Sequence, residues 1–373
     1  MSETLRQQVG KLLIVGLEGT ALTAVERAWL RLIRPGGIIL FRRNIEEAAQ
    51  TAALLRETTE IIGAPIFRCV DLEGGLVDRL RDLIAPMPSA AQVFATGKPA
   101  LYRQHGRLIA REAKLLGFNT VFAPVLDLAL PESSTVMRTR VVSANPQDVI
   151  TYASGFLDGL EAESVLGCGK HFPGLGGGNL DSHHSTPLIE RPWETMWNED
   201  IAPFRALAPR LSMIMASHAI YPKASHERRP ASISAFWISE ILRRKIKYTG
   251  LVVSDDMEMG GILTQQRIED AVIAAVSAGT DVVEICKDPA LVLHSYEALL
   301  TEAEKSTAFR QKITRAFRRI CKLAPPKQLF ALPAHSRILG LREKVKVFSD
   351  ININSFSSSV LQSGGNVYEN KNK

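Results

Sequence analysis

The sequence predicts an α/β fold, namely a (β/α)8 barrel of the TIM type that forms a single domain. Eight short runs of apolar and β-branched residues recur along the chain, and segments with helical spacing separate them. The runs are apolar nearly throughout, as in a parallel sheet that helices cover on both faces. Polar side chains follow five successive runs, and in such a barrel the C-terminal ends of the strands surround one opening.

The predicted strands and helices alternate along the chain. The strands are expected at residues 11–17, 37–41, 65–71, 120–127, 166–172, 212–219, 250–256 and 280–286. Segments with helical spacing include residues 46–62, 102–116, 146–161, 234–247 and 267–278. An open, doubly wound sheet is the alternative architecture, but no G-x-G-x-x-G motif follows the first predicted strand.

The composition is typical of a soluble globular protein. Of the 373 residues, 46% are hydrophobic and 23% are charged, and the net charge of +6 is spread along the chain. Dispersed charge without a recognition motif predicts no nucleic-acid partner, and no apolar run reaches the roughly 18–20 residues of a membrane span. Cysteines 69, 168, 286 and 321 are far apart in sequence, which favours reduced thiols. We therefore expect a cytoplasmic protein without cofactor, metal or membrane partner; a monomer is favoured, although the oligomeric state stays open.

The end of the chain differs from the rest. Pro325 and Pro326 interrupt the last helical pattern, so residues 1–325 are predicted to form the barrel. Residues 326–373 are predicted to be a C-terminal extension that is partly disordered. From Phe348 onward the sequence is rich in Ser and Asn and shows little periodicity.

Ionisable and polar residues stand where five of the predicted strands end. In chain order they are Asp71, Asp127, the pair Lys170 and His171, the pair Ser217 and His218, and the pair Asp255 and Asp256. These residues are distant in sequence, but closure of a barrel would bring them to one opening. Five successive strands that end in this way predict a functional site.

The loop after the fifth predicted strand carries an unusual set of groups. Residues 170–187 read KHFPGLGGGNLDSHHSTP, and four glycines at 174 and 176–178 allow positive φ and predict a mobile loop. Asp181 stands two residues before His183, which suits a general acid/base pair. One alternative is a metal site, and another is a loop of polar residues without chemistry. The metal alternative, built from His171, Asp181, His183, His184 and His218, is disfavoured because the chain has no H-E-x-x-H motif.

Two other segments offer carboxylates at strand ends. Residues 251–261 read LVVSDDMEMGG, and a strand that delivers Asp255 or Asp256 into a cleft suits the nucleophile of a retaining glycosidase. The alternative is a helix cap, and adjacent aspartates allow both roles. In residues 70–81, VDLEGGLVDRLR, Asp71 and Arg79 could bind sugar hydroxyls, or could form a surface salt bridge at a helix start.

Six motifs together resemble the β-N-acetylhexosaminidase branch of glycoside hydrolase family 3. They are PGGIILFRRN at 35–44, VDLEGG at 70–75, FAPVLD at 122–127, KHFPG…DSH at 170–183, RPAS at 229–232 and SDDMEM at 254–259. The resemblance runs from about residue 10 to residue 286 and implies a (β/α)8 barrel that removes terminal β-linked N-acetylglucosamine with retention. It also implies a carbohydrate substrate, by analogy muropeptide fragments in peptidoglycan recycling.

The resemblance assigns roles to individual positions. Asp255 is similar to the family's nucleophile, His183 to its acid/base and Asp181 to the partner of that histidine. The positions similar to the sugar-binding set are Asp71, Arg79, Arg140, Lys170 and His171.

One departure from the family pattern concerns the loop. The family motif usually reads KHFPGHG, and here Leu175 replaces the second histidine. The alternatives that stay open are a β-glycoside phosphorylase or β-glucosidase of the same family, and a non-catalytic sugar-binding homologue.

Overall fold

The computed structural model describes residues 4–178, 186–325 and 332–362, with side chains up to residue 351. Eight parallel strands close into a barrel in the order β1-β10-β9-β8-β7-β6-β3-β2. They are β1 (Leu13–Gly16), β2 (Gly37–Leu40), β3 (Phe67–Val70), β6 (Thr120–Val121), β7 (Leu166–Phe172), β8 (Met213–Ala216), β9 (Leu251–Asp256) and β10 (Val282–Ile285). The predicted (β/α)8 barrel is confirmed, and each of the eight predicted runs contains one of these strands.

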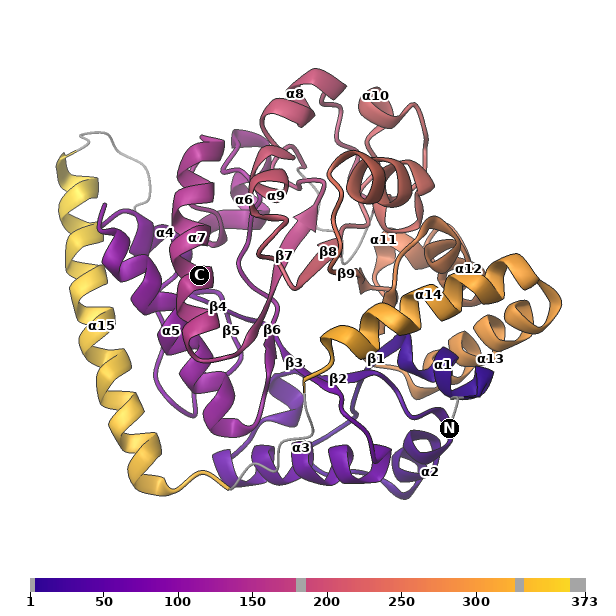
Figure 1. The fold of residues 1–373 in the computed structure, drawn as a ribbon. Helices are drawn as coiled ribbons and strands as arrows, with labels where there is room; N and C mark the ends of the chain where they lie inside the picture. The colour runs from indigo at the N-terminus through magenta and orange to yellow at the C-terminus, as the bar shows by residue number, and fades with distance from the viewer. Residues whose placement is uncertain (1–3, 179–185, 326–331, 363–373) are drawn as a thin grey trace.

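Helices surround the barrel and connect successive strands (Figure 1). The longer ones are α1 (Leu5–Lys11), α2 (Ala24–Ile33), α3 (Ala48–Ile62), α5 (Pro99–Leu116), α7 (Pro146–Ala162), α12 (Ile268–Ala278), α13 (Pro289–Lys305), α14 (Thr307–Leu323) and α15 (His335–Gln362). The shorter ones are α4 (Ala90–Phe94), α6 (Ser134–Met137), α8 (Trp193–Asn198), α9 (Ala202–Leu207), α10 (Pro222–Ser225) and α11 (Gly260–Leu263). A π-helix, η5 (Phe236–Lys245), and the 3-10 turns η1 (Arg42–Asn44), η2 (Pro131–Ser133), η3 (Arg138–Arg140) and η4 (Ala231–Ile233) complete the described part.

Local sequence explains where several of these elements begin and end. Thr23 and Glu26 form a capping box at the start of α2, with Thr23 Oγ1 3.1 Å from the Glu26 amide and Glu26 Oε2 2.7 Å from the Thr23 amide. The strand predicted at 120–127 is regular only over β6. Pro124 has no N–H for the ladder, so pairing with β7 resumes as a single bridge between Val125 and Lys170.

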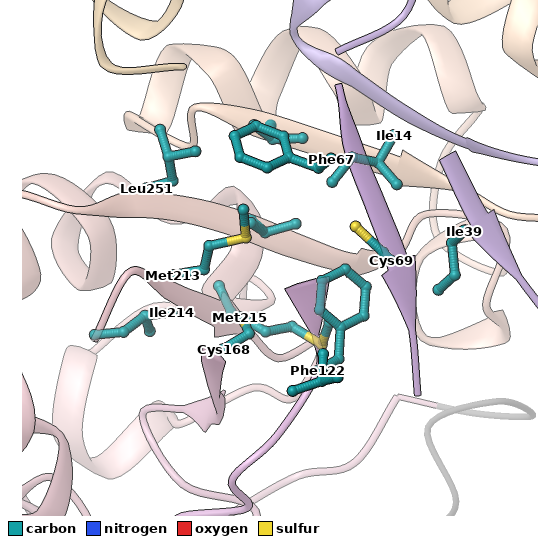
Figure 2. Close-up of a cluster of buried hydrophobic side chains, with 14 of the residues drawn as sticks. Ile14, Ile39, Phe67, Cys69, Phe122, Cys168, Met213, Ile214, Met215 and Leu251 are labelled. Carbon is teal, nitrogen blue, oxygen red and sulfur yellow. The ribbon is translucent and has the colours of Figure 1, made fainter. Parts of the chain in front are cut away.

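The interior of the barrel is packed with side chains from alternate positions of the strands. Figure 2 shows Ile14, Phe67, Met213 and Leu251 among the buried side chains that fill it. All four are at most 1% exposed. Because this apolar layer fills the barrel below, the polar residues at the C-terminal ends of the strands lie above it around an opening.

The C-terminal extension differs from its prediction in part. Helix α15 continues past Phe348 to Gln362, where an irregular tail was expected, and it lies along the barrel beside α4 and α5 (Figure 1). Leu341, Val345 and Phe348 are buried, and their spacing places them on one face of the helix. This apolar stripe explains why the segment forms a helix despite its Ser- and Asn-rich end.

Within the described residues, none of the helices combines the length and the apolar character that a membrane span requires.

Candidate active site

One pocket opens at the C-terminal ends of the barrel strands. The predicted residues Asp71, Arg79, Arg140, Lys170, His171 and Asp255 all line it. They come from the segment after β3, from η3, and from β7 and β9, so barrel closure brings together residues up to 184 positions apart in the sequence. Asp181 and His183 lie outside the described residues.

A hairpin after β3 supplies one wall of the pocket. Strands β4 (Leu72–Gly74) and β5 (Val77–Asp78) are antiparallel, and Gly74 and Gly75 in their turn have φ of +86° and +60°. A side chain at Gly75 would stand 2.4 Å from Ser89 Cβ, so the turn requires glycine there. The hairpin also contradicts a helix start in this segment.

Asp71 and Arg79 form an ion pair that lines the pocket. Arg79 Nη2 lies 3.7 Å from Asp71 Oδ2, and Lys170 Nζ lies 2.9 Å from Asp71 Oδ1. Burial alone would raise the pKa of the Asp71 carboxyl, but the charges of Lys170 and Arg79 hold it below its usual value. Asp71 is therefore an ionised acceptor at the wall of the pocket.

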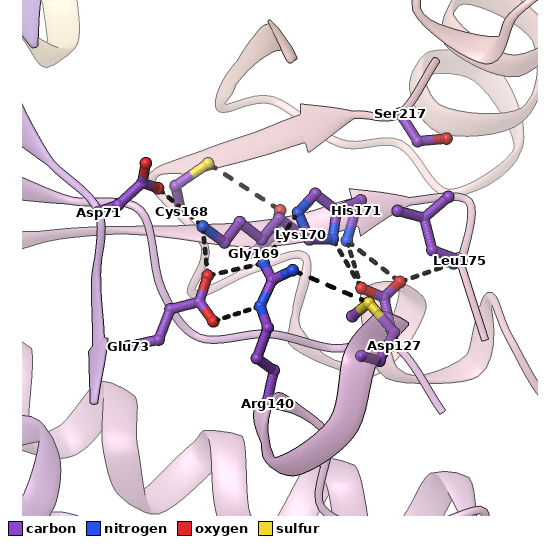
Figure 3. Close-up of polar contacts among 12 residues, drawn as sticks. Asp71, Glu73, Asp127, Arg140, Cys168, Gly169, Lys170, His171, Leu175 and Ser217 are labelled. Carbon is purple, nitrogen blue, oxygen red and sulfur yellow. Dashed lines mark hydrogen bonds and ion pairs between the residues drawn. The ribbon is translucent and has the colours of Figure 1, made fainter. Parts of the chain in front are cut away.

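Lys170 joins two carboxylates at the end of β7. Its Nζ lies 2.6 Å from Glu73 Oε1 as well as 2.9 Å from Asp71 Oδ1, and its side chain is only 3% exposed (Figure 3). Burial opposes the charge, but the two carboxylates outweigh it and raise the pKa of the Lys170 ammonium. The ammonium is therefore fixed in position and permanently charged.

Arg140 reaches the same carboxylate from η3. Its Nε and Nη2 donate to Glu73 Oε2 and Oε1 at 2.8 and 2.9 Å, which is a bidentate pair (Figure 3). Burial would raise the pKa of Glu73, but Arg140 and Lys170 lower it strongly. Glu73 is only 4% exposed, and its carboxylate holds Arg140 and Lys170 in place.

His171 is held by Asp127, which ends the segment after β6. His171 Nδ1 donates to Asp127 Oδ2 at 2.7 Å, while the backbone N–H groups of His171 and Leu175 donate to the same carboxylate (Figure 3). Arg140 Nη2 lies 3.5 Å from His171 Nε2. Asp127 therefore fixes the imidazole and the entry of the glycine-rich loop together.

The described part of that loop is packed closely. Among its four glycines, positive φ occurs only at Gly174, at +133°. Gly176 serves close approach instead, since a side chain there would stand 2.6 Å from the Leu128 carbonyl oxygen. Leu175 itself lines the pocket, where the family motif has histidine.

The end of β9 places both aspartates at the pocket. Asp255 Oδ1 accepts from the Asp256 amide at 2.9 Å, and Asp256 Oδ1 accepts from the Glu258 amide at 3.0 Å, so Asp256 caps the following turn. Burial raises the pKa of Asp256 to about 7. His218 Nε2 bonds the Asp256 carbonyl and Nδ1 bonds Ser232 Oγ, so this histidine is hydrogen-bonded at both nitrogens and fixes the end of β9.

Among the described residues, no three His, Cys, Asp or Glu side chains are arranged to hold a metal ion. Asp181, His183 and His184 of the metal alternative lie outside them.

Comparisons with known proteins identify the family of the chain. The family model described as the glycosyl hydrolase family 3 N terminal domain matches residues 4–323. The chain belongs to glycosyl hydrolase family 3. This confirms the family and the glycoside hydrolase class predicted from the sequence.

Two of the relatives that the chain resembles carry the name beta-hexosaminidase. The one from Idiomarina loihiensis is 34% identical over 302 residues, covering 80% of this chain and 90% of the relative. The one from Tolumonas auensis is 36% identical over 282 residues, covering 74% and 83%.

Solved family 3 structures share the fold. A β-N-acetylglucosaminidase from Paenibacillus sp. str. FPU-7 superposes with a TM-score of 0.85 at 29% identity, covering 93% of this chain and 69% of that one. A beta-N-acetylhexosaminidase from Beutenbergia cavernae gives 0.80 at 25% identity, covering 86% and 98%.

Two residues that line the pocket, Glu73 and Glu284, had no role in the sequence-based prediction, and Asp127 was predicted at the site without its partner. Glu73 stands inside VDLEGG, two positions after Asp71. In an extended segment, residues two positions apart point to the same side, so this spacing could have placed Glu73 beside Asp71. Asp127 was placed at a strand end, but its partner His171 is 44 positions away. Glu284 is the acidic residue inside the apolar run of β10, and it also lines the pocket.

Proposed function

We propose that this protein is a retaining exo-β-N-acetylglucosaminidase with Asp255 as nucleophile. The observation that carries the proposal is that one pocket holds Asp255 together with the ion network of Asp71, Lys170 and Arg140. A carboxylate opposite fixed hydrogen-bonding groups is what attack on a bound sugar requires. The names of the relatives support N-acetylglucosamine as the terminal sugar.

The sugar-binding groups have complementary chemistry. Asp71 accepts hydrogen bonds from sugar hydroxyls, while Arg79, Lys170 and Arg140 donate to sugar oxygens. His171 Nδ1 donates to Asp127, so its Nε2 is left as a hydrogen-bond acceptor. Because Glu73 and Asp127 hold three of these groups in place, little side-chain entropy is lost when the sugar binds.

The proposed reaction has two steps. Asp255 attacks the anomeric carbon while the bond to the leaving oxygen breaks, and imidazolium His183 gives its proton to that oxygen. Neutral His183 then takes a proton from water, the water oxygen bonds the anomeric carbon, and the Asp255 carboxylate is released. Asp181 orients His183. Two displacements on one carbon give retention.

The proposed physiological substrates are muropeptide fragments carrying terminal N-acetylglucosamine, hydrolysed in the cytoplasm during peptidoglycan recycling. This part rests on the resemblance in sequence.

A panel of aryl β-glycosides, assayed with and without phosphate, tests the proposal. We expect fastest turnover of the N-acetylglucosaminide, no rate increase with phosphate, and β-N-acetylglucosamine as the first product anomer by NMR. A sugar phosphate product would identify a phosphorylase, a preference for the glucoside a β-glucosidase, and no turnover a non-catalytic binding protein.

A further inference from the structure

Glu284 has a position at the pocket that the network described above does not use. On β10 it pairs in register with Ile14 of β1 and Asp256 of β9. Its amide donates to Ser254 Oγ at 3.0 Å, and its carbonyl accepts from the Met257 amide at 2.9 Å. These hydrogen bonds and the pairing with β1 and β9 therefore fix the backbone position of Glu284.

The carboxyl group of Glu284 is buried, and one of its two oxygens has no hydrogen-bond partner among the described residues. The residue is 2% exposed, and its Oε1 is inaccessible and unpaired among the described residues. Other carboxyls of the same pocket are satisfied: Glu73 accepts from two cations, and Asp71 from Lys170. Buried polar atoms are nearly always paired, so an unpaired carboxyl oxygen on a residue that lines a pocket points to a ligand that this carboxyl group contacts when the pocket is filled.

We propose that Glu284 is a substrate-binding residue, whose carboxyl group forms a hydrogen bond with a polar substituent of the terminal sugar. This inference rests on the proposed function, because it takes the pocket to hold a sugar. The pocket is also lined by Ile39, Phe122 and Met215, whose side chains offer the sugar no hydrogen bond.

The charge state of Glu284 suits this role. Burial, followed by the nearby carboxylates Asp71, Asp256 and Asp255, raises the pKa of Glu284 well above its usual value, and Lys170 opposes this only in part. A neutral carboxylic acid both donates and accepts, as a sugar hydroxyl does.

A cycle of protein variants and sugar analogues tests the inference. The affinity of N-acetylglucosamine and its 3-, 4- and 6-deoxy analogues is measured for the wild type, Glu284→Leu and Glu284→Gln by calorimetry. We expect Glu284→Leu to bind N-acetylglucosamine roughly tenfold more weakly, as for one lost hydrogen bond, and Glu284→Gln to retain most of the affinity. One deoxy analogue should bind the wild type more weakly, yet bind Glu284→Leu no more weakly than N-acetylglucosamine does.

Glu112 provides a matched control. It is a fully buried carboxyl on α5, both its oxygens are unpaired within the described part of the chain, and it is not among the residues lining the pocket. Glu112→Leu should leave sugar affinity unchanged, and thermal unfolding should show Glu284→Leu to be at least as stable as the wild type. Where Glu284→Leu does not fold, Glu284→Met takes its place in the cycle.

The outcomes separate the two proposals. The role of Glu284 would be overturned if folded Glu284→Leu bound N-acetylglucosamine with unchanged affinity. It would also be overturned if the effect of the substitution and the effect of the missing hydroxyl were additive for every analogue. Either result would leave the proposed glycosidase activity unaffected. A wild type that binds glucose but not N-acetylglucosamine would overturn the proposed substrate, and the same cycle with deoxyglucoses would then decide the role of Glu284.

Discussion

Replacement of Glu73 by glutamine tests whether this residue organises the sugar pocket. The Glu73 carboxylate makes three charge-assisted contacts, at 2.6 Å to Lys170 and at 2.8 and 2.9 Å to Arg140, while only 4% exposed. An amide nitrogen cannot accept, so Glu73→Gln loses at least one contact and leaves two buried cations less well compensated. One lost bond to a charged group costs about 1.5–3 kcal/mol, and a broken buried ion pair about 3–5 kcal/mol.

We therefore expect Glu73→Gln to lower the free energy of unfolding by about 3 kcal/mol, measured by urea denaturation. The value of kcat/KM on an aryl β-N-acetylglucosaminide should fall by about 100-fold, because a barrier increase of that size is about two powers of ten. The matched control is Glu163→Gln. Glu163 also accepts from two arginines, Arg107 and Arg111, at 2.8 Å each, but Arg107 is 51% exposed and neither arginine lines the pocket.

An exposed pair of this kind contributes about 0–1 kcal/mol, so Glu163→Gln should change little. Equal effects of the two substitutions on stability and on kcat/KM would refute the reasoning. The acid side of the stability profile provides a second check. The pKa of Glu73 is lowered in the folded state, so its contribution is present above the unfolded pKa, near 4.5, and is lost as the pH falls. Glu73→Gln should therefore lose stability less steeply below that pH.

Further predictions concern other residues. Asp255→Ala should abolish turnover of aryl glycosides without changing the circular dichroism spectrum, and wild-type activity would exclude it as the nucleophile. His183→Ala should slow substrates with poor leaving groups far more than aryl glycosides, and equal losses would argue against an acid role. The folded pKa of Asp256, about 7, lies above the usual 3.8, so the folded state binds more protons in between and stability falls as the pH rises through this window. Asp256→Asn should therefore gain stability relative to the wild type on going from pH 5 to pH 8 in thermal unfolding; a constant difference would contradict the raised pKa. Phe348→Ala should cost about 3 kcal/mol and speed proteolysis of α15, with kcat/KM nearly unchanged; a loss of activity would instead couple α15 to the pocket.

The barrel was predictable because its signals are local. Each strand is a short apolar run, and parallel strands bring their C-terminal ends together whatever the loops between them do. For this reason Asp71, Lys170 and Asp255 were expected at one opening, and all three line one pocket. The exception at β6 is also local, since Pro124 interrupts the ladder within a run that is otherwise strand-like.

The partners of these residues could not be predicted in the same way, because they depend on tertiary geometry. Glu73 lies on β4, beside the turn at Gly74 and Gly75 where β5 folds back, and its contact with Lys170 joins two distant parts of the chain. The local sequence does not indicate that Lys170 forms an ion pair with Glu73 as well as with Asp71. Helix α15 was missed for a related reason, since its apolar stripe is sparse and is stabilised by contact with the barrel rather than by propensity.

The charges of the pocket explain why Glu73 and Glu284, which are both buried, are expected to have different roles. Glu73 is ionised because two cations contact it, so its carboxylate is already satisfied and acts on the substrate only through Lys170 and Arg140. Glu284 has no hydrogen-bonded partner for Oε1 among the described residues, and burial raises the pKa of its carboxyl group. Replacement of Glu73 should therefore affect stability and activity together, whereas replacement of Glu284 by an apolar residue should affect sugar affinity alone. Measuring both quantities for both variants distinguishes a residue that positions others from one that binds the sugar.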